Sequence, residues 1–260
     1  MTRARLFKIN RNDPIAWGRL GAALLLVSAV GLTPACDESV VEGGRVTSGE
    51  WDFYLNGEPV GTETYQIRRS GRQLQCTVRS EFPEALASAK ARLLLSARYR
   101  PLEFELVARR PPSGELEVKT DFEPRRARVW LKRGDLVRED WVQVSPGARL
   151  MEEGLVTLGQ MALQGLNLRR DEFTFAVLFP QRFRQVMVRV QNLGLERISV
   201  GDGPERPLRH LRLSLAGGAS DYWVDDRRRV VRYLSLLPSG ELEARRREDG
   251  PAAPIPAGGP

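Results

Sequence analysis

The sequence predicts a mainly β protein: an antiparallel curved sheet, arranged as a sandwich or a half-barrel, with one short helix between two β halves. Apolar residues alternate with polar ones along most of the chain, which is the period of strands that bury one face. Turn signals recur about every 8 to 12 residues, as they do in sandwiches and barrels. The alternation breaks once, at about residues 152–168, where apolar residues take helical spacing.

The first β half begins with a hairpin. Trp51, Phe53 and Leu55 alternate with polar positions, and Asn56 and Gly57 supply the pair of positive-φ residues that a two-residue hairpin turn needs. Further alternating runs follow through short connections, which favours an antiparallel meander. The strands expected in this half cover residues 51–55, 60–69, 74–82, 93–99, 102–108, 116–122, 129–131 and 141–144.

A helical segment separates the two halves. Leu155, Leu158, Ala162 and Leu166 recur at roughly helical spacing, but three glycines make this segment a poor helix on its own, so we expect it to pack against the sheet. The second half is expected to hold strands at 173–178, 186–190, 195–200, 208–215, 219–224, 230–236 and 241–245. One antiparallel domain therefore covers residues 46–248, and the Pro/Gly/Ala tail at 249–260 is expected to be disordered.

Residues 1–35 have the three parts of a secretion signal. A basic stretch precedes an apolar run of 12 residues at 21–32, and a short exit follows. A membrane-spanning helix needs about 20 apolar residues, so this run is typical of a signal peptide that is removed after export. We therefore expect the protein in the bacterial cell envelope.

The end of the signal resembles the lipobox of bacterial lipoproteins. Small Ala35 directly precedes Cys36, although Leu32 is one position from the leucine of the family's pattern. The resemblance implies a lipid anchor on Cys36, followed by a polar tether at 36–45 and by a domain facing the periplasm. Asp37 resembles the sorting residue that retains enteric lipoproteins in the inner membrane, a rule that varies among bacteria, so the choice of membrane stays open.

Two alternatives to lipidation remain. An ordinary signal-peptidase site would give a soluble periplasmic or secreted protein, in which Cys36 pairs with the only other cysteine, Cys76. A retained, uncleaved segment is the other alternative.

The charge of the mature chain excludes a strong electrostatic partner. The whole chain has a formal charge of +7, from 40 basic and 33 acidic residues. Removal of residues 1–35 leaves 35 basic and 32 acidic residues, or +3. This near balance gives no basic surface of the kind that nucleic-acid binding requires, so nucleic acid is not an expected partner.

Few residues offer catalytic chemistry. His210, the only histidine, lies in a strand-like run, and Cys76 alternates with Leu74 and Val78 as a core residue would. Glu152 and Glu153 are adjacent rather than placed across a cleft. The segments Gly201-Asp202-Gly203 and Asp225-Asp226 lack the spacing of a calcium loop and are interpreted as turns. We therefore expect no catalytic residue, metal or cofactor, and the ligand-binding residues remain unknown.

Both ends of the domain resemble a family of uncharacterised periplasmic β-sheet proteins, a domain of unknown function. The opening GEWDFYLNGEPVG at 49–61 is similar to the family's first hairpin. The segment DYWVDD at 221–226, which leads into VVRY at 230–233, is similar to its penultimate strand and turn. The resemblance implies two β halves around a helix. At the level of fold, such proteins are similar to periplasmic half-barrels that carry lipids or lipoproteins. It implies no catalytic residues.

The first hypothesis for function is a non-enzymatic envelope lipoprotein that binds an apolar or amphiphilic ligand in a cavity of the sheet. Its expected partners are the membrane, through the lipid anchor, and this ligand; the sequence indicates no protein partner. The alternatives are a structural or assembly lipoprotein without a ligand and a hydrolase of envelope polymers. An apolar pocket of several hundred cubic ångströms inside the sheet would distinguish the first from the second.

Overall fold

The computed structural model describes residues 46–82, 88–110, 114–201, 203–215 and 218–247. They lie in one of two units of the chain, residues 37–260. The expected signal peptide, tether and tail lie outside the described residues. The elements are β1 (Thr47–Leu55), β2 (Glu58–Ser70), β3 (Gln73–Glu81), β4 (Ser88–Ser96), β5 (Pro101–Arg110), β6 (Gly114–Phe122), β7 (Arg126–Arg133), β8 (Leu136–Gln143), β9 (Arg149–Leu150), α1 (Val156–Leu163), β10 (Glu172–Phe179), η1 (Pro180–Arg182), β11 (Arg184–Ile198), β12 (Arg206–Leu215), β13 (Gly218–Val224), β14 (Val230–Leu237) and β15 (Gly240–Arg246).

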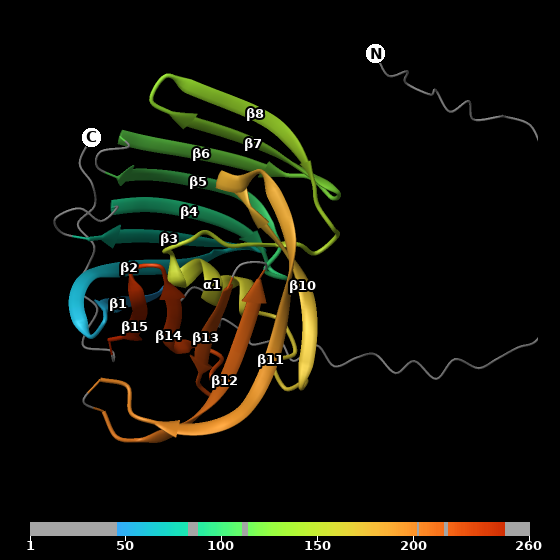
Figure 1. Ribbon diagram of the computed structural model, residues 1–260. Coiled ribbons are helices and arrows are strands. Elements are labelled where there is room, and N and C mark those ends of the chain that lie inside the picture. The colour runs from blue at the N-terminus through green and yellow to red at the C-terminus, as the bar shows by residue number, and fades with distance from the viewer. Residues whose placement is uncertain (1–45, 83–87, 111–113, 202, 216–217, 248–260) are drawn as a thin grey trace, which may run out of the picture. The chain divides into compact units, whose positions relative to one another are not determined.

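The described strands form one sheet, in the order β8-β7-β6-β5-β4-β3-β2-β1-β15-β14-β13-β12-β11-β10-β9. Each half is a meander, and the first and last strands of the domain, β1 and β15, pair with each other and join the halves (Figure 1). All pairings are antiparallel except that of β9 with β10. The predicted antiparallel curved sheet is therefore confirmed, and in the described residues it is one open sheet rather than a sandwich of two.

The β1–β2 turn shows how local sequence and distant pairing agree. Asn56 and Gly57 both have positive φ, 53° and 86°, as predicted for this hairpin. The Asn56 side chain also accepts a hydrogen bond from the backbone N–H of Glu241 at 2.9 Å and donates to the carbonyl of Ser239. The same residue thus closes one hairpin and fastens it to the turn between β14 and β15.

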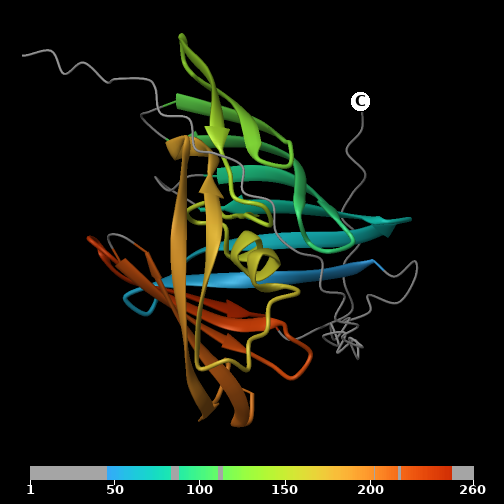
Figure 2. The same cartoon turned by 90° about the vertical axis from the view of Figure 1, so that its right-hand side faces the viewer.

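The sheet curves around α1 (Figures 1 and 2). Alternate residues of the strands fill this concave side; across one row of neighbouring strands they are Tyr65, Val78, Ala91, Leu106 and Val118, all buried. The residues between them face outward and are largely Arg, Lys, Glu and Thr. Burial of one strand face is the cause of the period-two pattern in the sequence.

Helix α1 lies where the sequence predicts one, but it is only eight residues long and every one of them is buried. Gly159 is unfavourable in an isolated helix, but the packing requires a glycine here, because a Cβ at this position would lie 2.6 Å from the Tyr222 hydroxyl oxygen. Glycine therefore lets the helix approach β13 closely. The segment packs between the two halves of the sheet, as expected for it.

Three details differ from the sequence-based expectation. Two predicted strands, 186–190 and 195–200, belong largely to the single 15-residue strand β11, which continues through a register shift between Asn192 and Gly194. Strand β9 has two residues and is parallel to its neighbour. Strand β8 begins at Leu136, five residues before the expected start. It shows little alternation in burial because nearly all of its residues are exposed.

Candidate functional site

The two predicted residues of the lipid anchor, Cys36 and Asp37, lie outside the described residues. Among those that the structure describes, no helix is long and apolar enough to span a bilayer. Cys76 is a free thiol on β3 with none of its surface exposed. Burial, and secondarily the nearby Glu63 carboxylate, raise the pKa of Cys76 well above its ordinary value. A disulfide with Cys36 would therefore require the tether to enter the core.

The concave side of the sheet contains a buried carboxylate that the sequence analysis did not single out. Glu63 on β2 accepts hydrogen bonds from the backbone N–H groups of Val156 and Thr157, at 3.2 and 2.8 Å. These N–H groups belong to the first turn of α1 and have no partner within the helix. Trp51 on β1 donates from Nε1 to the Thr157 hydroxyl at 3.2 Å. A side chain 93 residues away in sequence thus caps the helix.

The surroundings of Glu63 oppose its ionisation. Burial raises its pKa to about 7, while the hydrogen bonds from Thr157 and Val156 favour the charged form and limit the rise. The pKa of Tyr222, on β13 next to α1, is likewise raised by burial. These groups are enclosed with Cys76 in a continuous hydrophobic core, so the chemistry of this interior is that of helix capping and packing.

Glu152 and Glu153, adjacent in sequence, lie in different surroundings. Glu152 is buried, which raises its pKa to about 8, and its Oε1 accepts a hydrogen bond from the backbone N–H of Gln181 at 3.4 Å. Glu153 is exposed and forms an ion pair with Arg182. The pair therefore fastens the segment before α1 to η1 and does not form two carboxylates facing a cleft.

His210 lies on the outer face of β12, on the opposite side from the core residue Leu211. Its Nε2 is 2.9 Å from Oδ1 of Asp221, and its Nδ1 is 3.1 Å from Oε2 of Glu196. The imidazole stacks on the Trp223 ring with centroids 4.4 Å apart, and the Trp223 indole donates to Glu196 at 2.8 Å. The cluster links β11, β12 and β13 through side chains alone.

This arrangement provides an imidazole and two carboxylates but no nucleophile. A Ser-His-Asp type site needs a hydroxyl or thiol within hydrogen-bond reach of the imidazole. In the described residues both ring nitrogens of His210 face carboxylates instead. Asp221 also accepts hydrogen bonds from Arg212 at 2.9 and 3.3 Å. We therefore interpret the cluster as a cross-strand brace.

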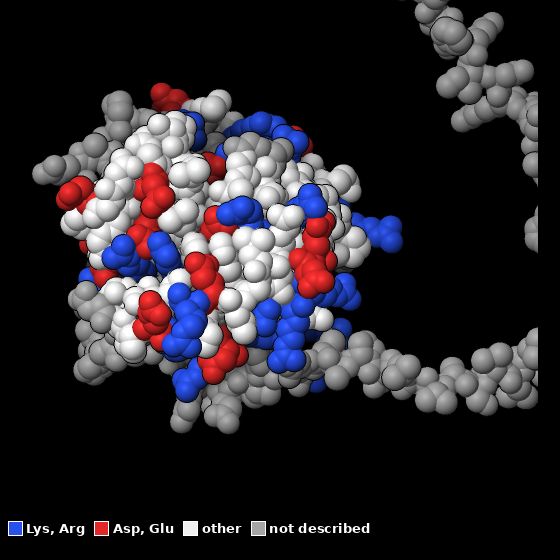
Figure 3. Space-filling view, turned by 60° about the horizontal axis from the view of Figure 1, so that its bottom comes forward, with Lys and Arg blue, Asp and Glu red and all other residues white. Residues whose placement is uncertain are grey.

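The brace continues as a chain of opposite charges on the outer surface. Arg232 lies 4.6 Å from the Trp223 ring centroid and donates to Glu243 at 2.6 Å, and Glu243 also accepts from Arg245 at 2.7 Å. The face of the molecule in Figure 3 accordingly shows acidic and basic side chains next to each other, with no large area of one sign.

The two glycine- and aspartate-containing segments are turns in their described parts. Asp225 accepts hydrogen bonds from the backbone N–H and the Nε of Arg229, both at 2.8 Å, and so closes the turn between β13 and β14. Gly201 and Gly203 flank Asp202, which lies outside the described residues. Within the described residues no three His, Cys, Asp or Glu side chains are grouped so that they could hold a metal ion.

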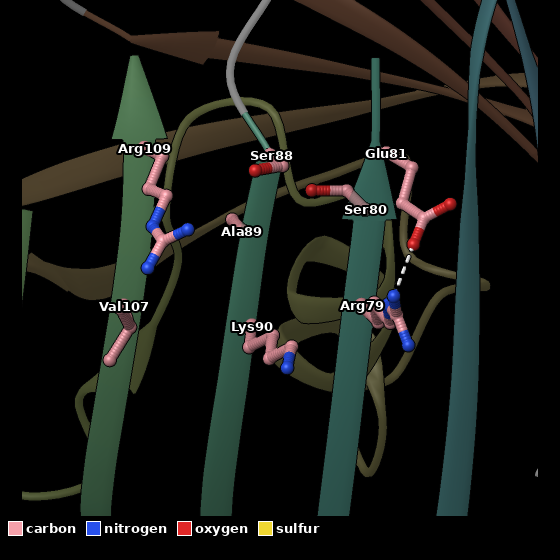
Figure 4. A pocket seen from close by; sticks show the side chains of 8 residues that line it. All are labelled: Arg79, Ser80, Glu81, Ser88, Ala89, Lys90, Val107 and Arg109. Carbon is pink, nitrogen blue, oxygen red and sulfur yellow. Dashed lines mark ion pairs between the residues drawn. The ribbon is translucent and has the colours of Figure 1, made fainter. Parts of the chain in front are cut away.

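A pocket of about 300 Å³ opens on the outer face of β3, β4 and β5. Figure 4 shows Arg79, Lys90 and Arg109 projecting from three neighbouring strands, with Val107 on the same strand as Arg109 and next to Lys90. The remaining lining residues are Ser80, Glu81, Ser88 and Ala89. Three basic side chains thus meet one acidic side chain around a small apolar surface.

The register of β3 and β4 makes this pocket electrostatically unusual. Arg79 and Lys90 stand directly opposite each other, and like charges in this position destabilise an antiparallel pair. Arg79 is paired with Glu81 at 2.6 Å and Arg109 with Glu115 at 3.0 Å. No described acidic residue forms an ion pair with Lys90, whereas the next outward residue on β4, Arg92, pairs with both Glu103 and Glu105. Lys90 is therefore a cation without a described counter-ion.

A second pocket, of about 270 Å³, lies on the outer face of β6, β7 and β8. Its lining holds two basic and two acidic side chains, Lys119, Arg128, Asp121 and Glu139. Arg128 pairs with Glu139 at 2.6 Å, and Lys119 lies 5.4 Å from the Trp130 ring centroid. Both pockets lie outside the curve of the sheet, whereas the concave side is filled by α1 and the core.

Comparison with known proteins identifies the fold but no family. No family model and no curated protein matches the chain. Among solved structures, it is similar to a β-barrel-like protein of the domain of unknown function DUF1849 from Brucella abortus, with a TM-score of 0.54, 9% identity, and coverage of 77% of this chain and 95% of that one. A DUF1089 family protein from Pseudomonas aeruginosa matches more weakly, with a TM-score of 0.36, 13% identity, and coverage of 65% and 87%. The chain therefore has the β-barrel-like fold of an uncharacterised domain.

Proposed function

We propose that this chain is a non-enzymatic, lipid-anchored protein of the bacterial cell envelope, and that it binds an anionic amphiphile at the basic pocket of β3–β5. The signal-like segment and Cys36 support export and anchoring. The positions of the reactive side chains support a non-catalytic role, because Cys76 is buried and both nitrogens of His210 face carboxylates.

The observation that carries the ligand proposal is the juxtaposition of Arg79 and Lys90 across β3 and β4. Glu81 already pairs with Arg79 and Glu115 with Arg109, but Lys90 has no described counter-ion, and an anion beside Lys90 would supply one. Val107, which is 42% exposed, adds apolar surface beside it. A phosphate or carboxylate headgroup with the start of an acyl chain matches this combination better than a purely apolar ligand does.

The lipid anchor would bring such a ligand within reach. A chain held at the membrane by Cys36 meets amphiphiles at high local concentration, since tethering replaces free diffusion by a short linker. The proposed ligand site is on the outer face of the sheet.

The test uses the exported chain carrying Cys36→Ala, which removes the anchor, and water-soluble lipids below their micelle concentration. Calorimetric titration with dihexanoyl phosphatidylglycerol should give saturable binding. Lys90→Gln should weaken it about tenfold, the effect of ~1.4 kcal/mol for one lost charge contact. The matched control is Arg92→Gln on the same strand and face, whose charge is already paired with Glu103 and Glu105. It should leave the affinity unchanged.

Two further probes separate headgroup from lipid recognition. Dihexanoyl phosphatidylcholine should bind more weakly than phosphatidylglycerol, because its headgroup has no net charge. Inorganic phosphate should bind more weakly as well, because it lacks the acyl chains that contact Val107. Equal affinity of phosphatidylglycerol for wild type and Lys90→Gln would refute the proposal.

A structural or assembly role is the second candidate function, and a specific feature favours it. Strand β8 forms an edge of the sheet, and Leu136, Val137 and Trp141 on it are 63, 55 and 43% exposed. Apolar side chains exposed together on an edge strand are typical of a contact surface. This role does not exclude ligand binding, because the basic pocket and the β8 edge lie on different strands.

A further inference from the structure

Among the described strands β8 is paired only with β7, so its other edge presents backbone N–H and C=O groups that are not paired in the sheet. One of them, the Trp141 N–H, donates to Asp140 Oδ1 at 2.8 Å within the same copy. Natural proteins commonly protect such an edge with proline, with a bulge, with charged side chains or by making the strand short. β8 is eight residues long, contains no proline and pairs with β7 in continuous register, but its central residues Arg138, Glu139 and Asp140 are charged. It is therefore a suitable template only for a strand whose charges complement these three.

The side chains of β8 are complementary to those of a second β8 in antiparallel orientation. A two-fold axis through Glu139 places Arg138 opposite Asp140 of the second copy, since directly opposed residues share one face. The same alignment places Val137 opposite Trp141 and Leu136 opposite Val142. Each apolar residue thus meets an apolar one. Arg138 and Asp140, which lie 3.6 Å apart within one copy, would each also face the opposite charge of the second copy.

Other symmetric registers lack this complementarity. A shift by two residues would place Arg138 against Arg138, or Asp140 against Asp140, of the second copy. In the favoured register the like-charged pair is Glu139 with Glu139, but each of these carboxylates is bound by Arg128 of its own sheet at 2.6 Å. The repulsion is therefore neutralised within each copy before the two meet.

We propose that two copies of this chain associate through antiparallel pairing of β8, with Glu139 at the two-fold axis, to form one sheet continuous across both copies. The inference is independent of the proposed ligand, because the basic pocket lies on β3–β5. A shared edge also explains why apolar side chains at Leu136, Val137 and Trp141 stand exposed in a single copy.

Cysteine cross-linking in intact cells tests the register with the full, membrane-anchored chain. Glu139→Cys places two thiols on directly opposed residues, whose Cα atoms lie about 4.5–5.5 Å apart in an antiparallel pair, within the range of a disulfide. A disulfide-linked dimer is expected. The matched control, Lys132→Cys, is on the same outer face of β7 and level with Val137. The two thiols would then lie about 20 Å apart, three strand spacings across and four residues along, and should not link. Absence of a linked dimer from Glu139→Cys, or equal linking by both variants, would overturn the proposal.

Charge exchange tests the same contact without a covalent bond. In sedimentation equilibrium of the Cys36→Ala chain, Arg138→Asp should weaken dimerisation on the order of tenfold, because repulsion replaces attraction at two symmetric positions. Combining it with Asp140→Arg should restore the dimer, since the charges are then exchanged rather than lost. A chain that stays monomeric at about 100 μM, or a double variant no better than the single one, would contradict pairing in this register.

Discussion

The buried carboxylate of Glu63 predicts a specific dependence of stability on pH. Burial raises its pKa from 4.5 to about 7 in the folded protein, so the folded state binds more protons than the unfolded state between these values. The free energy of unfolding then falls as the pH rises through this window. The stability that protonated Glu63 contributes is fully present below pH 4.5 and is lost above pH 7.

The magnitude follows from the difference between the two pKa values. One pH unit corresponds to about 1.4 kcal/mol, so ionisation of Glu63 costs the folded state ~3 kcal/mol at pH 8. Glu63→Gln removes the titration and keeps a similar shape. Its amide can still accept one hydrogen bond from the first turn of α1, and the loss of the other acts equally at every pH. The stability of this variant relative to wild type should therefore rise by ~3 kcal/mol between pH 4 and pH 8.

Urea unfolding of both proteins at several pH values measures this difference, with the slope of the denaturant dependence as a check on two-state behaviour. Glu172→Gln is a control of opposite sign. Hydrogen bonds from Arg189 lower the pKa of the exposed Glu172. The stability that Glu172→Gln loses relative to wild type should therefore be smallest at acid pH, where the wild-type carboxylate is protonated. A constant difference between wild type and Glu63→Gln from pH 4 to pH 8 would refute the buried, titrating carboxylate.

The remaining predictions concern the anchor, the thiol and the packing of α1. Metabolic labelling with a palmitate analogue should mark the wild-type chain and not Cys36→Ala, and equal labelling would end the lipobox interpretation. Cys76, fully buried, should react with an aromatic disulfide reagent only after denaturation; rapid reaction under native conditions would contradict its burial. Gly159→Ala should destabilise the protein by about 1–3 kcal/mol in thermal unfolding, because its Cβ meets the Tyr222 hydroxyl. Tyr222→Phe should recover part of that loss; no recovery would place the cause elsewhere.

The fold could be predicted from the sequence where one strand face is buried. Trp51 and Phe53 on β1 and Leu74, Cys76 and Val78 on β3 carry the alternation that the sheet then explains. Strand β8 could be predicted only in part, because a largely exposed edge strand leaves little alternation in its sequence. The parallel contact of β9 and the pairing of β1 with β15 depend on the course of the whole chain, which local patterns do not contain.

The candidate sites depended even more on tertiary structure. Glu63 has polar neighbours in the sequence, so no pattern there marks it as buried. Only the position of α1 makes it a helix cap. Lys90 is one of many basic residues in the sequence. Arg92 has a counter-ion and Lys90 has no described one because Arg92 stands opposite Glu105, whereas Lys90 stands opposite Arg79 and Val107. His210 could be named as the single histidine, but its carboxylate partners come from β11 and β13.

The most direct test of the proposed function is native mass spectrometry of the anchored protein released gently from its own membranes. The account predicts a bound anionic phospholipid in addition to the covalent anchor. This non-covalent ligand should be present on wild type and on Arg92→Gln, and lost or much reduced on Lys90→Gln. A wild-type protein without such a ligand, or the same ligand on all three proteins, would contradict binding at the basic pocket.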